Sequence, residues 1–157
     1  MLNEECRKNP SILYWIHTKK FEEFVMHALK GVHNCEIIHC GKTGDGGIDL
    51  KIINSDKPIL VQVKRRTESR ANFAEPIKDV REFLGAMVGE SEKGIYVTTA
   101  NKFSKQTKNT IEKKINSKIV TQFDLVNFDA LISLFNLGNQ NKDEVWENLI
   151  KTRKETH

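Results

Sequence analysis

Three short β-type segments, at about 35–40, 48–53 and 59–64, follow one another without a helix between them, and strand and helix patterns then alternate. In the third segment Gln62 and Lys64 share one face, because strand side chains alternate and Val63 points the other way. Consecutive strands joined by short turns pair antiparallel, whereas strand–helix–strand units pair parallel. The order therefore predicts a mixed sheet.

Helical patterns surround these segments. The first helix is expected at about 18–30, with Gly31 as its stop. In the second predicted helix, at about 75–89, Gly85 predicts close packing of the helix against a strand. We expect the other helices at about 75–89, 103–115 (N-cap Ser104) and 124–135 (N-cap Asp124), and the other strands at 94–99 and 118–122. A last amphipathic helix follows Gly138, with Asn141 as N-cap. The predicted fold is α/β, a mixed β-sheet flanked by helices in the order αβββαβαβα plus a C-terminal helix.

The bulk composition favours one soluble domain covering residues 1–157. Hydrophobic residues make up 38% of the chain and charged residues 29%, and no linker-like segment divides it. No apolar run approaches the roughly 20 residues that span a bilayer, and the first ten residues lack the apolar core of a signal peptide. We expect a cytoplasmic protein without a membrane partner. The three cysteines are sparse and odd in number, which disfavours a disulfide framework, and Cys35 and Cys40 would point to opposite faces of a strand, which disfavours a zinc site.

Positive charge is clustered in the sequence, although the formal net charge is only +4. One cluster follows the third β-type segment and contains Arg65, Arg66 and Arg70. A second, from Lys102 to Lys118, contains six lysines and a single acid, Glu112. Solvated faces are the ordinary explanation for such runs, but two clusters beside one candidate site favour a nucleic-acid partner.

The candidate chemistry lies in the segment from Gly44 to Asp49 and in Gln62-Val63-Lys64. A hairpin between the second and third strands would bring a carboxylate, an amide oxygen and an ammonium group to one end of a sheet. Each piece alone has an ordinary explanation, a tight turn in the first case and a half-exposed strand in the second. Together, in this order and on adjoining strands, they are typical of a phosphodiester-hydrolysing site.

A hard divalent cation, most naturally Mg²⁺ with Mn²⁺ as a substitute, fits these ligands. Asp49 would be the anionic ligand, with the Gln62 side-chain oxygen and the Val63 carbonyl as neutral ligands. Lys64 would orient the attacking water and stabilise negative charge. A second acid is expected from the first helix, with Glu22 as the best candidate and its neighbour Glu23 as the alternative. The two lie about 100° apart around the helix axis, so only one of them is expected to face the site.

These residues resemble the Mrr-like restriction endonuclease domain, a branch of the PD-(D/E)xK nuclease superfamily. The matching blocks are Phe21-Glu22, Gly44 to Asp49, Val61 to Arg65, Val80 to Ala86, Lys93 to Thr99 and Phe103-Ser104. The resemblance covers about residues 12–135, leaving 139–157 as a C-terminal helical extension. It implies a nuclease core that cleaves DNA with Mg²⁺, and it implies Asp49, Gln62, Lys64 and Glu22 as catalytic positions.

Two features depart from the wider superfamily. Gln62 stands where most members have an acid, although the Mrr-like branch commonly has glutamine there. The sequence also shows no separate DNA-binding domain, so target recognition would come from the core, the tail, a homodimer or a partner chain. The expected function is a metal-dependent endonuclease of double-stranded DNA, acting in restriction or defence. The alternatives are a Holliday-junction-type resolvase and a non-catalytic DNA-binding or scaffold module.

Phosphate contacts are expected from basic side chains near the hairpin and from the start of the lysine-rich cluster. The residues are Lys42, Arg65, Arg66, Arg70, Lys102 and Lys105.

Overall fold

A five-stranded mixed sheet forms the centre of the protein, in a computed structural model that describes residues 2–40, 47–53 and 57–139. The strand order is β1-β2-β3-β5-β7, with β1 at Glu36–His39, β2 at Leu50–Ile53, β3 at Ile59–Lys64, β5 at Lys93–Thr98 and β7 at Gln122–Val126. The first three strands pair antiparallel, and β3, β5 and β7 pair parallel. The predicted α/β fold with a mixed sheet is therefore confirmed.

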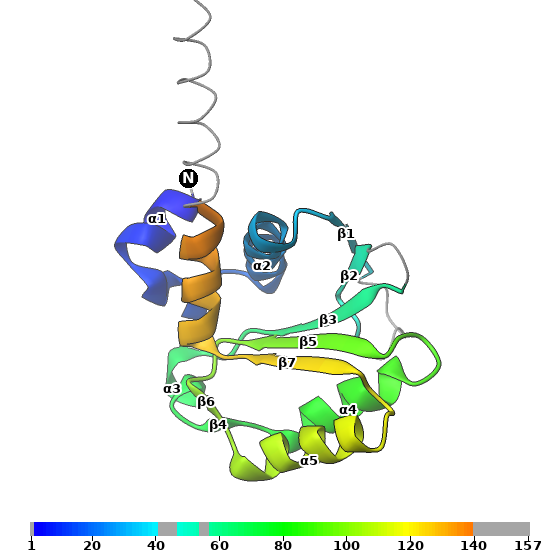
Figure 1. The fold of residues 1–157 in the computed structure, drawn as a ribbon. Coiled ribbons are helices and arrows are strands. Elements are labelled where there is room, and N and C mark those ends of the chain that lie inside the picture. The colour runs from blue at the N-terminus through cyan, green and yellow to red at the C-terminus, as the bar shows by residue number, and fades with distance from the viewer. Residues whose placement is uncertain (1, 41–46, 54–56, 140–157) are drawn as a thin grey trace, which may run out of the picture.

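Helices cover both faces of the sheet (Figure 1). One face carries α2 (Thr18–His33) and a helix at 128–139, and α1 (Leu2–Lys8) and the 3₁₀ helix η1 (Pro10–Tyr14) pack beside the latter. The other face carries α4 (Ile77–Met87) and α5 (Lys105–Asn116), the crossovers between the parallel strands. Short elements α3 (Glu68–Ala71), β4 (Ala74–Glu75) and β6 (Lys102–Phe103) lie at the carboxyl ends of β3 and β5, where β4 and β6 pair as a separate small sheet.

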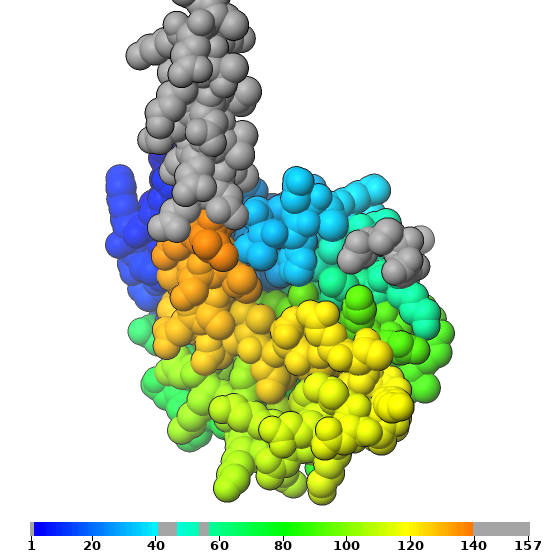
Figure 2. Space-filling model, in the orientation of Figure 1, coloured from blue at the N-terminus to red at the C-terminus, as the bar shows by residue number. Residues whose placement is uncertain are grey.

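Strand alternation divides the apolar side chains between two cores. Val61 and Val63 of β3 point to the core beneath α2, which is filled by the fully buried rings of Phe21 and Phe24. Leu60 of the same strand points to the opposite core. The space-filling view shows helix 128–139 (orange) filling the space between the N-terminal helices and α2 (Figure 2). Among the described residues, no helix has both the length and the apolar character needed to cross a bilayer.

Glycines allow two close approaches, and neither is the one predicted. Gly31 does not end its helix, because α2 continues to His33. It instead allows a close approach of the backbone at Gly138, since a Cβ at Gly31 would lie 2.8 Å from the Cα of Gly138. Gly94 in β5 admits Met87 of α4, whose Sδ would lie 2.5 Å from an added Cβ. Gly85, predicted to mark close packing, has no neighbour within 4 Å of such a Cβ, so that prediction is wrong.

The last strand is displaced from its predicted position at 118–122. Lys118 has a left-handed φ of 60°, which turns the chain before β7 begins at Gln122. Asp124 is an exposed strand residue instead of an N-cap, and the helix begins at 128 with Asn127 Oδ1 accepting from the N–H of Ala130 at 2.9 Å. Ser104 caps α5 as predicted, through the N–H of Thr107. The predicted helix capped by Asn141 lies outside the described residues.

Candidate active site

The carboxyl end of β3 meets the beginning of β2 at one end of the sheet. Asp49 directly precedes β2, and its backbone already follows the sheet, since its N–H donates to the carbonyl of Val61 at 2.9 Å and its carbonyl accepts from Cys40 at 2.8 Å. Gln62 is buried at 5% exposure, and Lys64 is partly exposed at the end of the strand. The hairpin predicted from the sequence therefore brings Asp49 beside β3.

One oxygen of Asp49 is held by two donors from β3. Its Oδ2 accepts from the backbone N–H of Val63 at 2.7 Å and from Nε2 of Gln62 at 2.8 Å. Both bonds orient the carboxylate, and Oδ1 receives neither of them. In this arrangement Gln62 acts on Asp49 as a donor, and Val63 contributes its N–H, whereas the sequence analysis considered the Gln62 oxygen and the Val63 carbonyl as ligands.

Gly47 lies against the side-chain oxygen of Gln62, on the side of the amide away from Asp49. Its φ is +87°, and an added Cβ would lie 2.2 Å from Oε1 of Gln62. A glycine is therefore required twice here, by the backbone conformation and by the contact with the amide.

We expect Gly47→Ala to lower the free energy of unfolding by about 1–3 kcal/mol and to reduce cleavage by more than that loss explains, because the displaced amide would release Asp49. Thermal melting and plasmid-cleavage assays on the same preparation measure both effects. Gly85→Ala is the matched control, and in the middle of α4 it should stabilise by up to about 1 kcal/mol. A Gly47→Ala chain with wild-type cleavage would contradict the role given to this contact.

Glu22 approaches the same place from α2. It is partly buried, whereas its neighbour Glu23 is exposed, so Glu22 is the member of the predicted pair that faces Asp49. Burial raises the pKa of Glu22, and the negative charge of Asp49 raises it further. Burial also raises the pKa of Asp49, although the Val63 N–H, the Lys64 ammonium and the Gln62 amide each act to lower it. Two carboxylates that repel one another thus share a partly desolvated site.

These raised pKa values predict how stability changes with pH in a metal-free solution. The folded protein holds the two protons more tightly than the unfolded chain, so the contribution of these two groups to stability is greatest below the ordinary carboxylate pKa of about 4 and is lost as pH rises through the raised values. We expect Asp49→Asn to raise the melting temperature by a few degrees at neutral pH and to leave it unchanged in acid. An equal gain at both pH values would contradict the electrostatic origin.

The donor set suits a hard divalent cation. Two carboxylates converge, and a cation between them would relieve both the repulsion and the cost of burial. Within the described ranges, no group of three or more His, Cys, Asp or Glu side chains is placed to hold a metal. Mg²⁺ commonly binds through one or two carboxylates and keeps several waters, so Asp49 and Glu22 would be a sufficient protein contribution to such a site.

Comparison with known proteins agrees with this geometry. The sequence profile of the Mrr_cat family, described as a restriction endonuclease, matches residues 13–135. The chain belongs to this family. No curated protein and no solved structure gives a significant match. The match spans α2 and every strand that the structure describes, and it includes all the residues placed at the site above.

The basic residues predicted as phosphate contacts fall into two groups in this Mrr_cat domain. Arg70, Lys102 and Lys105 are exposed on α3, β6 and α5, which leaves their charges available to a ligand. Arg65 and Arg66 are partly buried and have protein partners. Arg65 donates to the carbonyl of Tyr14, which ties the end of β3 to η1. Lys42 and residues 44–46 lie outside the described residues.

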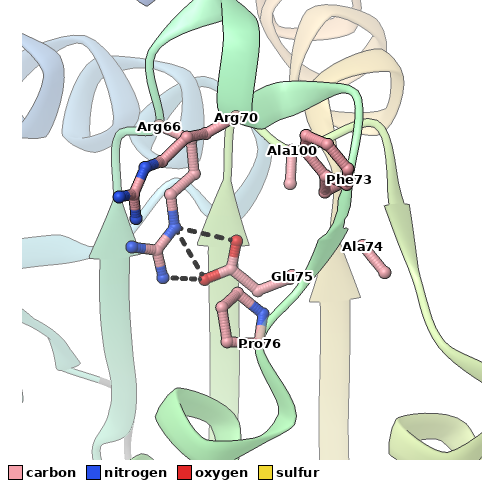
Figure 3. A pocket seen from close by; sticks show the side chains of 7 residues that line it. All are labelled: Arg66, Arg70, Phe73, Ala74, Glu75, Pro76 and Ala100. Carbon is pink, nitrogen blue, oxygen red and sulfur yellow. Dashed lines mark hydrogen bonds and ion pairs between the residues drawn. The ribbon is translucent and has the colours of Figure 1, made fainter.

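Arg66 instead belongs to a polar network that the sequence analysis missed. Its guanidinium makes ion pairs with Glu75 and Asp79, and Figure 3 shows it beside the Glu75 carboxylate. Glu75 is 2% exposed and also accepts from the hydroxyls of Tyr96 (2.7 Å) and Thr98 (2.6 Å). A duplex phosphate would have to compete with two carboxylates for Arg66, so we do not retain it as a DNA contact.

This network extends to β5, one strand away from Gln62 and Lys64 of β3. Tyr96 and Thr98 of β5 are the register partners of Gln62 and Lys64 of β3. Thr99 fixes the backbone after Lys64 by hydrogen bonds. Its N–H donates to the Lys64 carbonyl at 3.2 Å, and its hydroxyl accepts from the N–H of Arg66 and donates to the Arg66 carbonyl. The signal in the sequence is an acid at 75 next to Pro76, a pattern that predicts the start of a helix.

Proposed function

We propose that the protein is a Mg²⁺-dependent endonuclease that hydrolyses phosphodiester bonds of double-stranded DNA in restriction of foreign or modified DNA. The observation that carries the proposal is the convergence of Asp49, Glu22 and Lys64 at one end of β3, with both carboxylates destabilised in their charged forms. Membership of a restriction endonuclease family supports the reaction class.

Each side chain has a distinct proposed task. Asp49 and Glu22 hold the cation, which when bound neutralises charge on the scissile phosphate and lowers the pKa of a coordinated water. The Val63 N–H and the Gln62 amide keep Asp49 in one orientation. Lys64, fixed by the strand and by Thr99, orients the attacking water and stabilises negative charge on the phosphate as a point charge.

The duplex is proposed to lie across the carboxyl ends of β3 and β5. This end carries the exposed cations of α3, β6 and the beginning of α5, whose N-terminal residue is Lys105. Such contacts hold a duplex through its phosphates and make its affinity depend strongly on salt. They carry no sequence information, so target choice requires other contacts.

The decisive experiment combines supercoiled plasmid and a short linear duplex with Mg²⁺, Mn²⁺ or a chelator. We expect metal-dependent nicking or linearisation by the wild-type chain and none by Asp49→Ala. Asp124→Ala, which removes an exposed carboxylate from β7, is the matched control and should cleave normally. Cleavage that persists in Asp49→Ala, or that is unaffected by the chelator, would overturn the proposal. Cleavage of four-way junctions in preference to both substrates would instead support the function of a Holliday-junction-type resolvase.

A further inference from the structure

A pocket of about 300 Å³ opens beyond the end of β3 (Figure 3). Arg66 and Arg70 lie on one side, Phe73 lies on the other, and Glu75 lies between them. Pro76 and Ala100 complete a largely apolar lining. The volume is at the lower end of the roughly 300–1,000 Å³ typical of ligand pockets, so it suits one small ring system.

Phe73 is the exceptional residue of this pocket, because 70% of its surface is exposed. Its backbone is nevertheless fixed: its N–H donates to the carbonyl of Arg70 at 3.1 Å, and Ala74 is held in the β4–β6 pair opposite Lys102. A rigid scaffold therefore presents an aromatic face to solvent at the mouth of the pocket. A face of this kind provides a stacking surface for a planar ring.

The charges around Phe73 favour an anionic partner. Arg70 and Lys102 are exposed, and neither forms an ion pair with any residue in 2–40, 47–53 or 57–139. Of the nearby acids, Glu75 and Asp79 are bound to Arg66. Arg70 lines the pocket with Phe73, and Lys102 lies on β6, the strand that pairs with β4 directly after Phe73. An exposed aromatic ring with cations on its own and a neighbouring segment is the combination that binds a nucleobase with its phosphates.

We propose that this pocket receives one unpaired base of the DNA substrate, stacked on Phe73, with the adjoining phosphates held by Arg70 and Lys102. The inference rests on the proposed function, since it takes DNA as the ligand and Lys64 as the catalytic lysine. Only Arg65 separates Lys64 from Arg66, so the base would be extruded close to the scissile phosphate. The enzyme would then favour DNA carrying an unpaired nucleotide over a fully paired duplex.

The test measures binding without cleavage, using the full chain in chelator and two duplexes that differ by one extra, unpaired iodinated uracil. We expect tighter binding of the bulged duplex and photochemical cross-linking of the uracil to the peptide that contains Phe73. Phe73→Ala should weaken binding of the bulged duplex about tenfold and leave binding of the paired duplex unchanged, because base–aromatic stacking acts only on the unpaired base. Phe73→Trp should retain the preference.

Val88→Ala is the matched control, because Val88 is 69% exposed at the opposite end of α4. It should leave both affinities unchanged. Equal binding of the two duplexes by the wild-type chain, or an equal loss for both in Phe73→Ala, would overturn the base pocket while leaving the nuclease proposal intact. Failure of the wild-type chain to bind either duplex, together with no cleavage in Mg²⁺, would overturn both.

Discussion

Lys64→Ala is expected to reduce DNA cleavage by about 10²- to 10⁴-fold while the protein remains folded and still binds DNA. Lys64 ends β3 with its side chain partly exposed, so its removal opens no cavity in either core. The lysine charge also lowers the pKa of Asp49, so the variant loses both a stabilising cation at the phosphate and part of the support for a charged Asp49. Single-turnover cleavage at saturating protein isolates the chemical step from binding.

Two comparisons make the Lys64 result interpretable. Lys93→Ala removes a similarly half-buried lysine from the opposite end of the neighbouring strand and should cleave at the wild-type rate. Lys64→Arg retains the charge but replaces a compact ammonium by a planar group, so we expect it to recover only part of the activity. A Lys64→Ala chain that cleaves within a few-fold of wild type would remove lysine from the proposed mechanism.

Glu75→Ala is expected to lower the free energy of unfolding by about 3–5 kcal/mol, because it leaves Arg66 without its main partner in a partly buried position. The hydroxyls of Tyr96 and Thr98 would lose their acceptor at the same time. Denaturant unfolding, followed by both circular dichroism and fluorescence, measures the change and checks that the transition remains two-state.

Glu82→Ala is the control for this stability effect. Glu82 lies on α4 in an exposed ion pair with Lys78, and such pairs contribute at most about 1 kcal/mol. Combining Glu75→Ala with Arg66→Ala should cost clearly less than the sum of the two single changes, since the double variant leaves neither member of this pair without the other, and Asp79 loses Arg66 in the Arg66→Ala single variant as well. Strict additivity would show that the two side chains do not act as a pair.

The central part of the fold was predictable because its local patterns agree with its tertiary contacts. The alternation in 59–64 identified β3 to the residue, and the short connection at 54–58 between the second and third β-type segments correctly implied that β2 and β3 pair as a hairpin. The same alternation placed Gln62 and Lys64 on one face. Recognition of Glu22 needed the family resemblance, since a carboxylate on an amphipathic helix is ordinarily solvated.

Other features depend on contacts that no local pattern encodes. The buried Glu75 is explained by Arg66, Tyr96 and Thr98, which lie 9 to 23 residues away along the chain. The same contacts hold residue 75 in a short strand where local propensity indicated a helix. The displacement of β7 has a similar cause, because Phe123 and Val126 are buried against different cores when Gln122–Val126 pairs with β5.

The placement of β3 between an antiparallel and a parallel neighbour has a consequence for how the protein folds while it is being synthesised. All four side chains proposed for catalysis are contained in the first 64 residues, but β3 also depends on β5, which is synthesised later and reaches it across α4. Such non-local parallel pairing is a slow step in folding. A nascent chain would therefore carry all four of these side chains before the sheet that aligns them has closed, so folding itself would delay the appearance of the proposed DNA-cutting activity in the cell that makes the protein.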